Sequence, residues 1–571
     1  MRVYLTHCFY ISNERVILGP LKVFLAAGRH KHGLAAARAL ALEGVDVDVG
    51  AENKRSPSFS SKYVTNRIIY PSPYSGRRFI QAVEAADQRY SYDVILPVGS
   101  ETWPLFVFTD SYIKEKVPLP SRASYEIASN KYKTAVFASS ISVPIPFTFM
   151  EGMSPHDFVS KIKPPVIMKP SKGSGGVTYV WDVNEVEEAC EELLSLREKP
   201  FVVQEYIPGE AFGYFGLYNR GHPVAEFMHK RIREFPDTGG PSTAAESVFD
   251  KELRETGRKV LSSLKWHGLA MVEFKKDSRD GLFKVIEINP KLWGSLDLTI
   301  ASGINFPLLS CRLVAEGDVT PQFEYKVGLR YQWPFPDDLQ HLLFMTSKSA
   351  GVLPDLFNLR VRKNLWLRDL LPTFSMSSAF LYSTLRKQVK NLLRGSAFPP
   401  KAFGWVVPGR LAASGRPKLQ NEVIWLKKNK INSILSLTEM RISSRLVSQL
   451  NASYFHVPMF DHEPPDTQSI LRACDIIDEE LNKGHVVLVH CEGGIGRSGT
   501  VLACWLIRQK GIEAETAISM IRKLRPGSIE ESQVESVQNF GRFVADNVIS
   551  KSKGVEVIHE AAVEKASRNS T

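Results

Sequence analysis

Residues 490–500 read His-Cys-Glu-Gly-Gly-Ile-Gly-Arg-Ser-Gly-Thr. An apolar run at 485–489 predicts a buried strand before this stretch, and the apolar residues of 500–507 predict the core face of a helix after it. The three glycines let the intervening loop curl so that successive backbone N–H groups point inward. Such a nest binds anions, and the N-terminus of the following helix reinforces it. The sequence therefore predicts a phosphate-binding loop between a strand and a helix.

Three side chains in this loop can perform chemistry. The field that binds phosphate also favours a thiolate at Cys491, and the thiolate is the nucleophilic form of cysteine. Arg497 offers a planar fork that can hold two phosphate oxygens at once. Ser498 can hydrogen-bond the thiolate, and it can also cap the helix, since both roles are compatible. A buried structural cysteine is the alternative, but the neighbouring glycines and arginine disfavour it.

The stretch resembles the His-Cys-x5-Arg-Ser/Thr loop of the cysteine-dependent tyrosine and dual-specificity phosphatases, and it matches that motif throughout. The resemblance implies a phosphocysteine intermediate and a metal-free reaction. It also implies a general acid that protonates the leaving oxygen. Asp461 ends a predicted strand 30 positions before Cys491 and is our first candidate, with Asp466 as the alternative. The loop residues that would surround the phosphate are Glu492, Gly493, Gly494, Ile495 and Gly496.

Other features of this C-terminal region bear on the substrate. The region spans only about 150 residues, which is closer to the dual-specificity class than to the larger tyrosine-specific enzymes. Glu492 and Ile495 are acidic and apolar, where phosphoinositide-directed relatives tend to carry lysines. We therefore expect a phosphoprotein or a small phosphorylated metabolite as substrate. Gln533 and Gln538 resemble residues that flank the site and can position water.

Length and composition limit the remaining possibilities. A chain of 571 residues predicts two to four domains, and its 43% hydrophobic content is that of a globular protein. Six scattered cysteines without a CxxC pair favour the reducing cytoplasm. No apolar run is long enough for a membrane span, and no zinc spacing or aromatic-basic stripe indicates nucleic-acid binding. The net charge of +11 could attract anionic substrates or a membrane surface, and it identifies neither.

The N-terminal region alternates strand and helix patterns from 21 to about 118, which predicts a small parallel sheet. Its first turn carries Gly28 and then Gly33, which is not the GxGxxG pattern, so the sequence does not support a bound dinucleotide. Glu101 follows a predicted strand and could face a substrate. A solvated loop carboxylate or a helix-cap carboxylate is the interpretation that we favour for it.

A second site is predicted from segments far apart in sequence. A strand ends at Lys169 and runs into a Ser/Gly loop at 171–176, which can fold over phosphates. Two later strands carry Glu273 on one, and Glu287 and Asn289 on the same face of the other, because side chains alternate along a strand. Such converging oxygen ligands suit Mg²⁺ that carries nucleotide phosphates.

These segments resemble the ATP-grasp superfamily over most of residues 20–330. The resemblance implies an ATP-grasp fold after a Rossmann-like domain, with ATP and Mg²⁺ as cofactors and an acyl phosphate made from a carboxylate. One departure is Lys291, where the family often has arginine, and it leaves catalytic competence open. By position, the implied nucleotide contacts are Lys131, Lys169, Ser174, Gly175 and Gly176 at the phosphates or adenine, the backbone of Glu205 and Ile207 at the adenine edge, and Glu210 at the ribose; Glu273, Glu287 and Asn289 would hold Mg²⁺.

Two basic features have no fixed interpretation from sequence. Arg231 and Arg233 share a strand face and could bind an acidic substrate or the γ-phosphate, and a solvated strand edge is equally favoured. Lys387, Lys390 and Arg394 form a basic patch that could touch a membrane or stay solvated, and we favour the latter.

The sequence as a whole predicts an α/β multidomain protein. Its predicted parts are 1–118, a Rossmann-like domain; 119–330, an ATP-grasp domain; 331–400, an accessory segment; 401–550, the phosphatase domain; and 551–571, a polar tail. The predicted function is an ATP-grasp ligase joined to a phosphatase, with the carboxylate and acceptor unknown. Two alternatives stay open: a non-catalytic nucleotide-binding module that regulates the phosphatase, and an opposed kinase and phosphatase that share one substrate.

Overall fold

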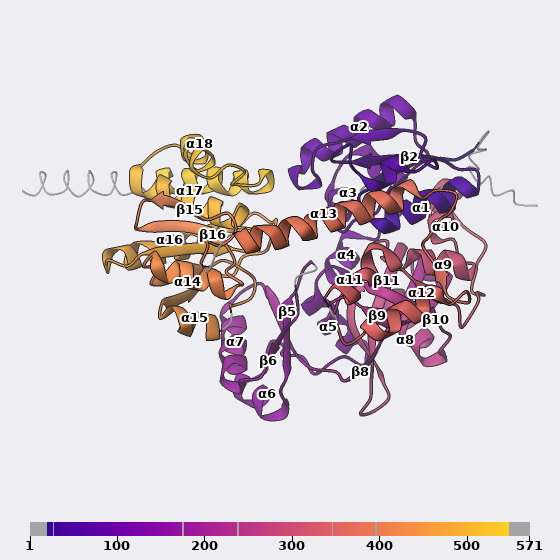
Figure 1. Ribbon diagram of the computed structural model, residues 1–571, viewed down its shortest axis with the longest axis horizontal. Helices are drawn as coiled ribbons and strands as arrows, with labels where there is room; N and C mark the ends of the chain where they lie inside the picture. The colour runs from indigo at the N-terminus through magenta and orange to yellow at the C-terminus, as the bar shows by residue number, and fades with distance from the viewer. Residues whose placement is uncertain are drawn as a thin grey trace, which may run out of the picture. The chain divides into compact units, whose positions relative to one another are not determined.

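The computed structural model describes residues 20–546 except 27, 174–175, 237–238, 345, 394–396 and 443; the side chains of 386–393 and 444–445 are also outside the description (Figure 1). The predicted tail at 551–571 therefore lies outside the described residues, as do the side chains of Lys387, Lys390 and Arg394. The chain divides into two compact units. Unit 1 holds most of the chain up to Ser383, and unit 2 holds mainly the chain from Thr384.

Unit 1 begins with a four-stranded parallel sheet in the order β3-β2-β1-β4. The strands are β1 (Lys22–Ala26), β2 (Asp46–Ala51), β3 (Arg67–Ile69) and β4 (Val94–Pro97), with helices α1 (Lys31–Leu42) and α2 (Arg77–Tyr90) between them. Strands β1 and β4 are almost wholly buried, as expected for a parallel sheet covered on both faces. The predicted parallel sheet is confirmed.

A second, three-stranded sheet in unit 1 has the order β6-β5-β7. It consists of β5 (Val166–Pro170), β6 (Thr178–Val180) and β7 (Phe201–Glu205), and helices α6 (Pro155–Lys161) and α7 (Val183–Ser195) accompany it. Strands β5 and β6 pair as an antiparallel hairpin. The Ser/Gly loop predicted to cover phosphates is the connection of this hairpin.

The largest sheet in unit 1 has seven strands in the order β12-β11-β8-β9-β10-β13-β14. Helices α8 (Lys251–Ser263), α9 (Leu296–Ser302) and α10 (Phe306–Glu316) belong to the same part of the chain. The strands are β8 (Gly209–Asn219), β9 (His222–Glu234), β10 (Ser242–Ser247), β11 (Gly268–Asp277), β12 (Phe283–Asn289), β13 (Arg330–Gln332) and β14 (Arg362–Lys363).

The segment after β13 packs onto this sheet. It contains the helical turn η4 (Pro334–Asp338), α11 (Leu339–Leu343), α12 (Val352–Phe357) and α13 (Leu371–Leu393). Strand β14 pairs in parallel with β13 and so extends the sheet into this segment. No single helix in the described ranges has the length and hydropathy of a membrane span, although the bent pair α9 and α10 meets both criteria together.

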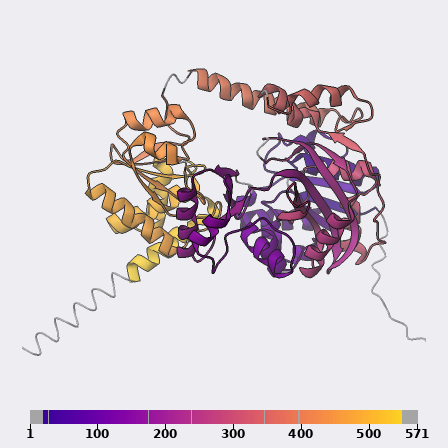
Figure 2. The ribbon, with the colours of Figure 1, turned by 90° about the horizontal axis from the view of Figure 1, so that it is seen from below.

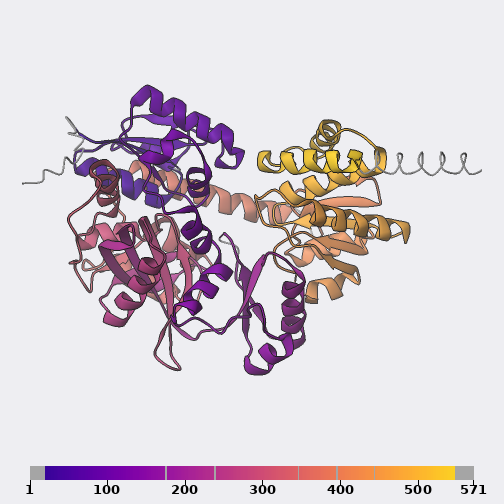
Figure 3. The same ribbon diagram turned by 180° about the vertical axis from the view of Figure 1, so that it is seen from behind.

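Unit 2 is an α/β domain around a five-stranded sheet in the order β15-β16-β19-β17-β18 (Figures 1 and 3). Alternate residues of the central strand face opposite layers: Val487 and Val489 pack in one hydrophobic cluster, and Leu488 in the other. The strands are β15 (Gly404–Val407), β16 (Leu411–Gly415), β17 (Ser433–Ser436), β18 (Ser453–His456) and β19 (Val487–Cys491), and the helices are α14 (Gln420–Lys428), α15 (Ser444–Leu450), α16 (Thr467–Asn482), α17 (Gly496–Lys510) and α18 (Ala514–Leu524).

Two candidate active sites

The predicted phosphate loop joins the central strand β19 to α17. Gly494 has a φ of +75°, and a Cβ atom there would stand 2.1 Å from the backbone nitrogen of Gly415, so only glycine fits. Its N–H donates to Cys491 Sγ at 3.2 Å, and Ser498 Oγ lies 3.5 Å from the same sulfur. The structure thus brings the predicted nucleophile, a loop N–H and Ser498 together.

Arg497 is the most strongly fixed side chain of this site. It is fully buried, and its Nη1 donates to the carbonyl oxygens of Leu437 and Met459 and to Glu439 Oε2, at 3.2, 2.7 and 2.9 Å. Its Nη2 lies 2.9 Å from Asp461 Oδ1. Burial acts to lower the pKa of Arg497, but the carboxylates of Glu439 and Asp461 outweigh it and raise the pKa. The guanidinium is therefore held in its charged form beside the loop.

The two candidates for the general acid have different surroundings. Asp466 caps α16, where its Oδ1 accepts from the N–H of Ser469 at 2.9 Å, so its carboxylate is engaged away from the loop. Asp461 is 43% exposed and pairs with Arg497, and its own N–H donates to Glu439 Oε1 at 2.8 Å. The geometry favours Asp461 over Asp466.

Sequence reasoning missed several residues around the phosphate loop. Glu439 orients both Arg497 and the backbone of Asp461. His462 lies 2.7 Å from Glu530 Oε2 through Nδ1, and this hydrogen bond raises its pKa although burial acts in the opposite direction. Each partner comes from a distant segment, so no local pattern could have revealed the pair.

The α18 side of the loop is held by Arg525 and Gln533. Arg525 donates to the carbonyl oxygens of Gly494 and Ala413, and its burial lowers its pKa. Gln533 is fully buried and accepts from Thr500 Oγ1 at 3.3 Å, beside the loop as expected. Gln538 instead donates to Glu515 at the surface.

The rim of the phosphate loop is more basic than its sequence indicates. Lys418 forms a short ion pair with Glu492, and Arg416 Nη1 lies 3.9 Å from the same carboxylate. Both cations come from the connection between β16 and α14. The acidic residue in the loop is therefore paired with cations from a neighbouring segment, which weakens the sequence argument against a phosphoinositide substrate.

In unit 1 the predicted metal ligands also come together. Glu273 and Glu287 are direct partners on β11 and β12, and Asn289 Nδ2 donates to both, at 3.0 and 2.8 Å. Lys131 and Lys169 lower the pKa of Glu287 to about 2 against the effect of burial, whereas burial raises the pKa of Glu273. Two carboxylates and an amide are the oxygen donors that suit Mg²⁺ when nucleotide phosphates complete its shell. Among the described residues, no group of three or more His, Cys, Asp or Glu could hold a metal alone.

Two lysines extend this cluster toward the β5–β6 loop. Lys131 Nζ lies 3.3 Å from Glu287 Oε2 and donates to the carbonyl oxygen of Gly173 at 2.7 Å. Lys169 is buried, which lowers its pKa to about 8. A Cβ atom added at Gly176 would meet nothing within 4 Å, so this end of the loop has open space. Ser174 and Gly175 lie outside the described residues.

The residues expected at the adenine and ribose lie at the end of β7, in the β7–β8 connection and at the start of β8. The Glu205 side chain is fixed by Arg279 at 2.8 Å and by the N–H of Phe147 at 2.9 Å, and its own N–H donates to the carbonyl oxygen of Phe147 at 2.8 Å. Ile207 is buried. Glu210 is exposed and pairs with Lys230 at 2.5 Å.

The two arginines of β9 have different environments. Arg231 Nη2 pairs with Glu273 Oε2 at 2.7 Å, so it lies among the predicted metal ligands and not at a solvated strand edge. Arg233 is 4% exposed and binds Asp338 and Asp355 at 2.7 and 2.5 Å. It anchors the segment after β13 to the sheet, so neither of the two roles left open from sequence, a ligand contact or a solvated strand edge, describes Arg233.

Glu101, for which we favoured a solvated position, is buried. Its side chain is 5% exposed and accepts from Arg29 and His30, at 2.8 and 2.9 Å. Burial raises its pKa, but His30 and Arg29 lower it to about 2. The cluster lies after β1 and β4, where the strand order of the parallel sheet reverses, and such reversal points commonly hold ligands. Glu101 is therefore a buried, paired carboxylate and not a solvated one.

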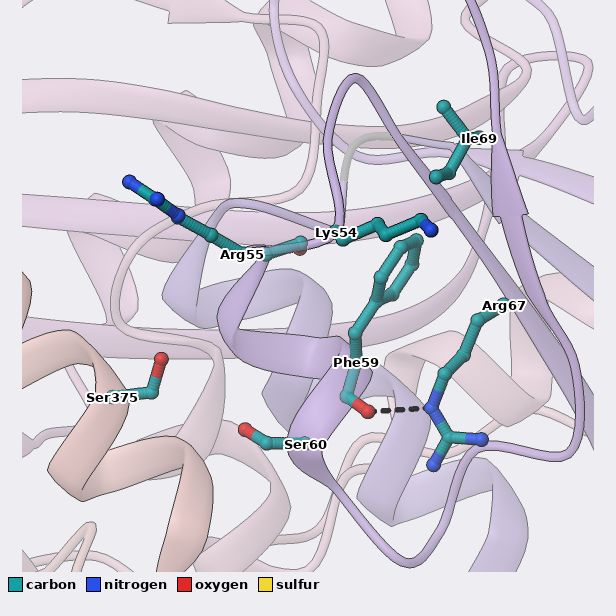
Figure 4. A pocket seen from close by; sticks show the side chains of 8 residues that line it. Lys54, Arg55, Phe59, Ser60, Arg67, Ile69 and Ser375 are labelled. Atoms are coloured by element: carbon teal, nitrogen blue, oxygen red, sulfur yellow. Dashed lines mark hydrogen bonds between the residues drawn. The ribbon is translucent and has the colours of Figure 1, made fainter.

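A cavity of about 400 Å³ lies elsewhere in unit 1, between the segment that follows β2, with its helical turn η1 (Pro57–Ser60), and α13. Its cationic lining residues are Lys54, Arg55 and Arg67. Figure 4 shows the Lys54 and Arg55 side chains pointing to opposite sides, and Arg67 donating to the carbonyl oxygen of Phe59. None of the residues that line this cavity is a predicted site residue. Because its cations do not converge on one point, the cavity is not an anion-binding site.

Comparisons with known proteins match both halves. Residues 400–538 match the family described as Swiss Army Knife protein, DSP-PTPase phosphatase domain, and residues 197–334 match the family described as ATP-grasp in the biosynthetic pathway with Ter operon. The chain is 28% identical to the tyrosine-protein phosphatase cdc-14 of Caenorhabditis elegans over 22% of this chain and 19% of the relative. It is 29% identical to the phosphatidylglycerophosphate phosphatase PTPMT2 of Arabidopsis thaliana over 23% of this chain and 59% of the relative.

The chain thus spans about a fifth of the length of the first curated relatives that it matches. Among solved structures, an L-amino acid ligase from Bacillus licheniformis covers 52% of this chain and 75% of its own, with 18% identity and a TM-score of 0.42. Tk-PTP in its active form covers 25% of this chain and 97% of its own, with 28% identity and a TM-score of 0.23. At these TM-scores the likenesses add nothing to the fold described above.

Proposed function

Because the chain joins an ATP-grasp domain of the Ter-operon type to a C-terminal dual-specificity-type phosphatase domain, we propose that it is a bifunctional enzyme. One half would activate a carboxylate with Mg-ATP, and the other would hydrolyse a phosphate monoester. The observation that carries the proposal is the grouping of Cys491, Arg497 and Asp461 around the loop. The described cysteines are buried and free, which supports a reducing compartment such as the cytoplasm.

The phosphatase reaction would have two steps. The thiolate of Cys491 attacks phosphorus while Arg497 and the loop N–H groups hold the phosphate oxygens. As the S–P bond forms and the P–O bond breaks, Asp461 gives its proton to the leaving oxygen. Water then attacks the phosphocysteine and returns its proton to Asp461, and the S–P bond breaks with the help of Ser498. No metal ion takes part in this scheme.

The basic rim and the relatives bear on the phosphatase substrate. Arg416 and Lys418, which pair with Glu492, can instead pair with an acidic group near the phosphate of a substrate, but they do not require one. The relatives are named as protein phosphatases and as a lipid phosphatase, so both a phosphoprotein and a small phosphorylated molecule fit the proposal.

In unit 1, Glu273, Glu287 and Asn289 would hold Mg²⁺, and Lys131, Lys169 and Arg231 would bind the nucleotide phosphates. Mg-ATP, when bound, supplies the phosphoryl group that converts a carboxylate to an acyl phosphate. The buried carboxylate of Glu101 and its more exposed partners Arg29 and His30 are our candidates for orienting the second substrate. A non-catalytic nucleotide sensor remains the second candidate, because Lys291 replaces the arginine that the family often carries.

Two assays test the proposal as a whole. The full chain is expected to hydrolyse para-nitrophenyl phosphate in the presence of EDTA, and to release ADP from Mg-ATP when a suitable carboxylate is added with hydroxylamine as the acceptor. If the chain bound ATP tightly but released no ADP with any carboxylate, the ligase hypothesis would be ruled out and the non-catalytic nucleotide sensor would be favoured. Hydrolysis that required a metal would rule out the phosphatase scheme.

Replacing Glu287 with glutamine is expected to lower ADP release by at least about 10–100-fold, because even residues that only support metal ligands have effects of this size. The change removes a negatively charged oxygen next to Asn289 and Lys131. ADP should be measured over a range of Mg²⁺ concentrations. The exposed Glu255→Gln change on α8 is the control and should leave the rate unchanged; an equal loss in both variants would contradict a role for Glu287.

Replacing Asp461 with asparagine is expected to lower kcat about 100-fold, since general acids contribute at least that much. The loss should be larger for phenyl phosphate than for para-nitrophenyl phosphate, because the poorer leaving group needs the proton more. The matched Asp466→Asn change keeps an oxygen that can cap α16 and should leave kcat within a few-fold. The opposite ranking of the two variants would make Asp466 the acid.

A further inference from the structure

The outer segment, which we define as residues 343–382 of unit 1, carries a concentration of exposed apolar side chains. Leu359 is 97% exposed, Leu367 84% and Phe357 77%. Leu371, Phe374 and Tyr382 on α13 are 66–68% exposed. Figures 1 and 2 agree that α12 and the first turns of α13 lie on the same outer side of unit 1. Single exposed leucines are normal on a protein surface, but a gathered set marks a surface that binds something.

The backbone of the outer segment is fixed to the rest of unit 1 at two places. Strand β14 lies between α12 and α13 and pairs with β13 in the large sheet. Asp369, just before α13, accepts from Arg38 Nε at 2.8 Å in a buried ion pair. The outer segment is therefore fixed in its middle, at β14, and again at Asp369. Its apolar side chains are presented outward by a fixed backbone.

The exposed charges of the outer segment have one sign. Its cations Lys348, Arg360, Arg362 and Arg368 are exposed. Its two carboxylates, Asp355 and Asp369, are 6% and 5% exposed and are consumed by internal ion pairs. A partner that covers this surface must therefore accept both apolar side chains and positive charge.

We propose that the outer segment docks unit 1 onto the surface of an anionic phospholipid membrane. Leucine and aromatic side chains enter the boundary between head groups and acyl chains, and arginine and lysine contact lipid phosphates. A second copy of this chain is disfavoured as the partner, because two identical faces would place like charges opposite each other. The proposal does not depend on either catalytic activity.

The test is co-sedimentation of the full chain with vesicles of phosphatidylcholine alone and of equal parts phosphatidylcholine and phosphatidylglycerol. Binding is expected only to the phosphatidylglycerol vesicles and should weaken as salt is raised. The double change Leu359→Ser and Leu367→Ser, and separately Arg360→Glu and Arg368→Glu, should each lower the binding constant about tenfold or more. Leu42→Ser with Leu282→Ser, two exposed leucines outside the outer segment, is the matched control and should have no effect.

Each other outcome overturns the proposal. Equal binding to both vesicle types, or no binding to either, excludes an anionic membrane as the partner. A concentration-dependent dimer that the Leu359 and Leu367 changes dissolve would identify a second copy as the occupant. Hydrolysis of para-nitrophenyl phosphate and the unfolding temperature are measured on every variant, so that loss of vesicle binding is not mistaken for loss of folding.

Discussion

The Cys491→Ser variant should lose phosphomonoester hydrolysis by a factor on the order of 10⁴–10⁶, the loss seen when a catalytic nucleophile is removed. A serine hydroxyl at this position stays protonated near neutral pH, so the loop has no anionic nucleophile to attack phosphorus opposite the leaving oxygen. The N–H of Gly494 and Ser498 Oγ, both within 3.5 Å of the sulfur, would then hydrogen-bond a neutral oxygen. The measurement is kcat for para-nitrophenyl phosphate.

The same variant separates the two halves of the proposal. Its ADP release should equal that of the natural sequence, since the carboxylates and lysines of the nucleotide site lie in unit 1. Cys504→Ala, in α17 and also buried, is the control for removing a cysteine and should retain kcat within a few-fold. Hydrolysis that survived in Cys491→Ser would show that another group attacks phosphorus.

The Arg233→Met variant should lower the free energy of unfolding of unit 1 by about 3–5 kcal/mol, the range for removing one partner of a buried ion pair. Asp338 and Asp355 would remain buried with their main cation gone. The loss should appear as an earlier transition of unit 1 in urea, while the transition of unit 2 stays in place.

The control for this change is Lys230→Met on the same strand. Lys230 pairs with Glu210 at the surface, where such pairs contribute about 0–1 kcal/mol, so little destabilisation is expected. If Arg233→Met instead left the unfolding curve unchanged and raised the KM for ATP, the arginine would face the nucleotide after all.

The features that could be predicted from sequence are those whose residues lie close together in the chain or follow the periodicity of one strand. The phosphate loop is contiguous, so its preceding strand, its following helix and the roles of its glycines, cysteine and arginine could all be predicted from residues 485–507. The ligand pair Glu287 and Asn289 followed from alternation on one strand, and the antiparallel pairing then placed Glu273 opposite Glu287. These local and periodic rules gave the fold class and the position of both candidate sites.

The same rules could not supply partners from distant segments. Alternation along the strand predicts that Arg231 and Arg233 share one face. Arg233, however, donates to carboxylates that lie more than 100 positions later in the chain. Glu101 was taken for a solvated residue because its partners Arg29 and His30 follow a different strand. Glu439 and Arg525 likewise reach the phosphate loop from separate parts of unit 2. Only the packed structure shows these contacts.

The ion pair between Glu492 and Lys418 on the rim of the phosphate loop gives the site an exchangeable counterion. A substrate with a second acidic group can take the place of the Glu492 carboxylate on Lys418, so that one ion pair replaces another with little net change in free energy. A substrate without such a group leaves the original pair intact. The rim would therefore accept molecules of different charge and would leave selection among them to shape.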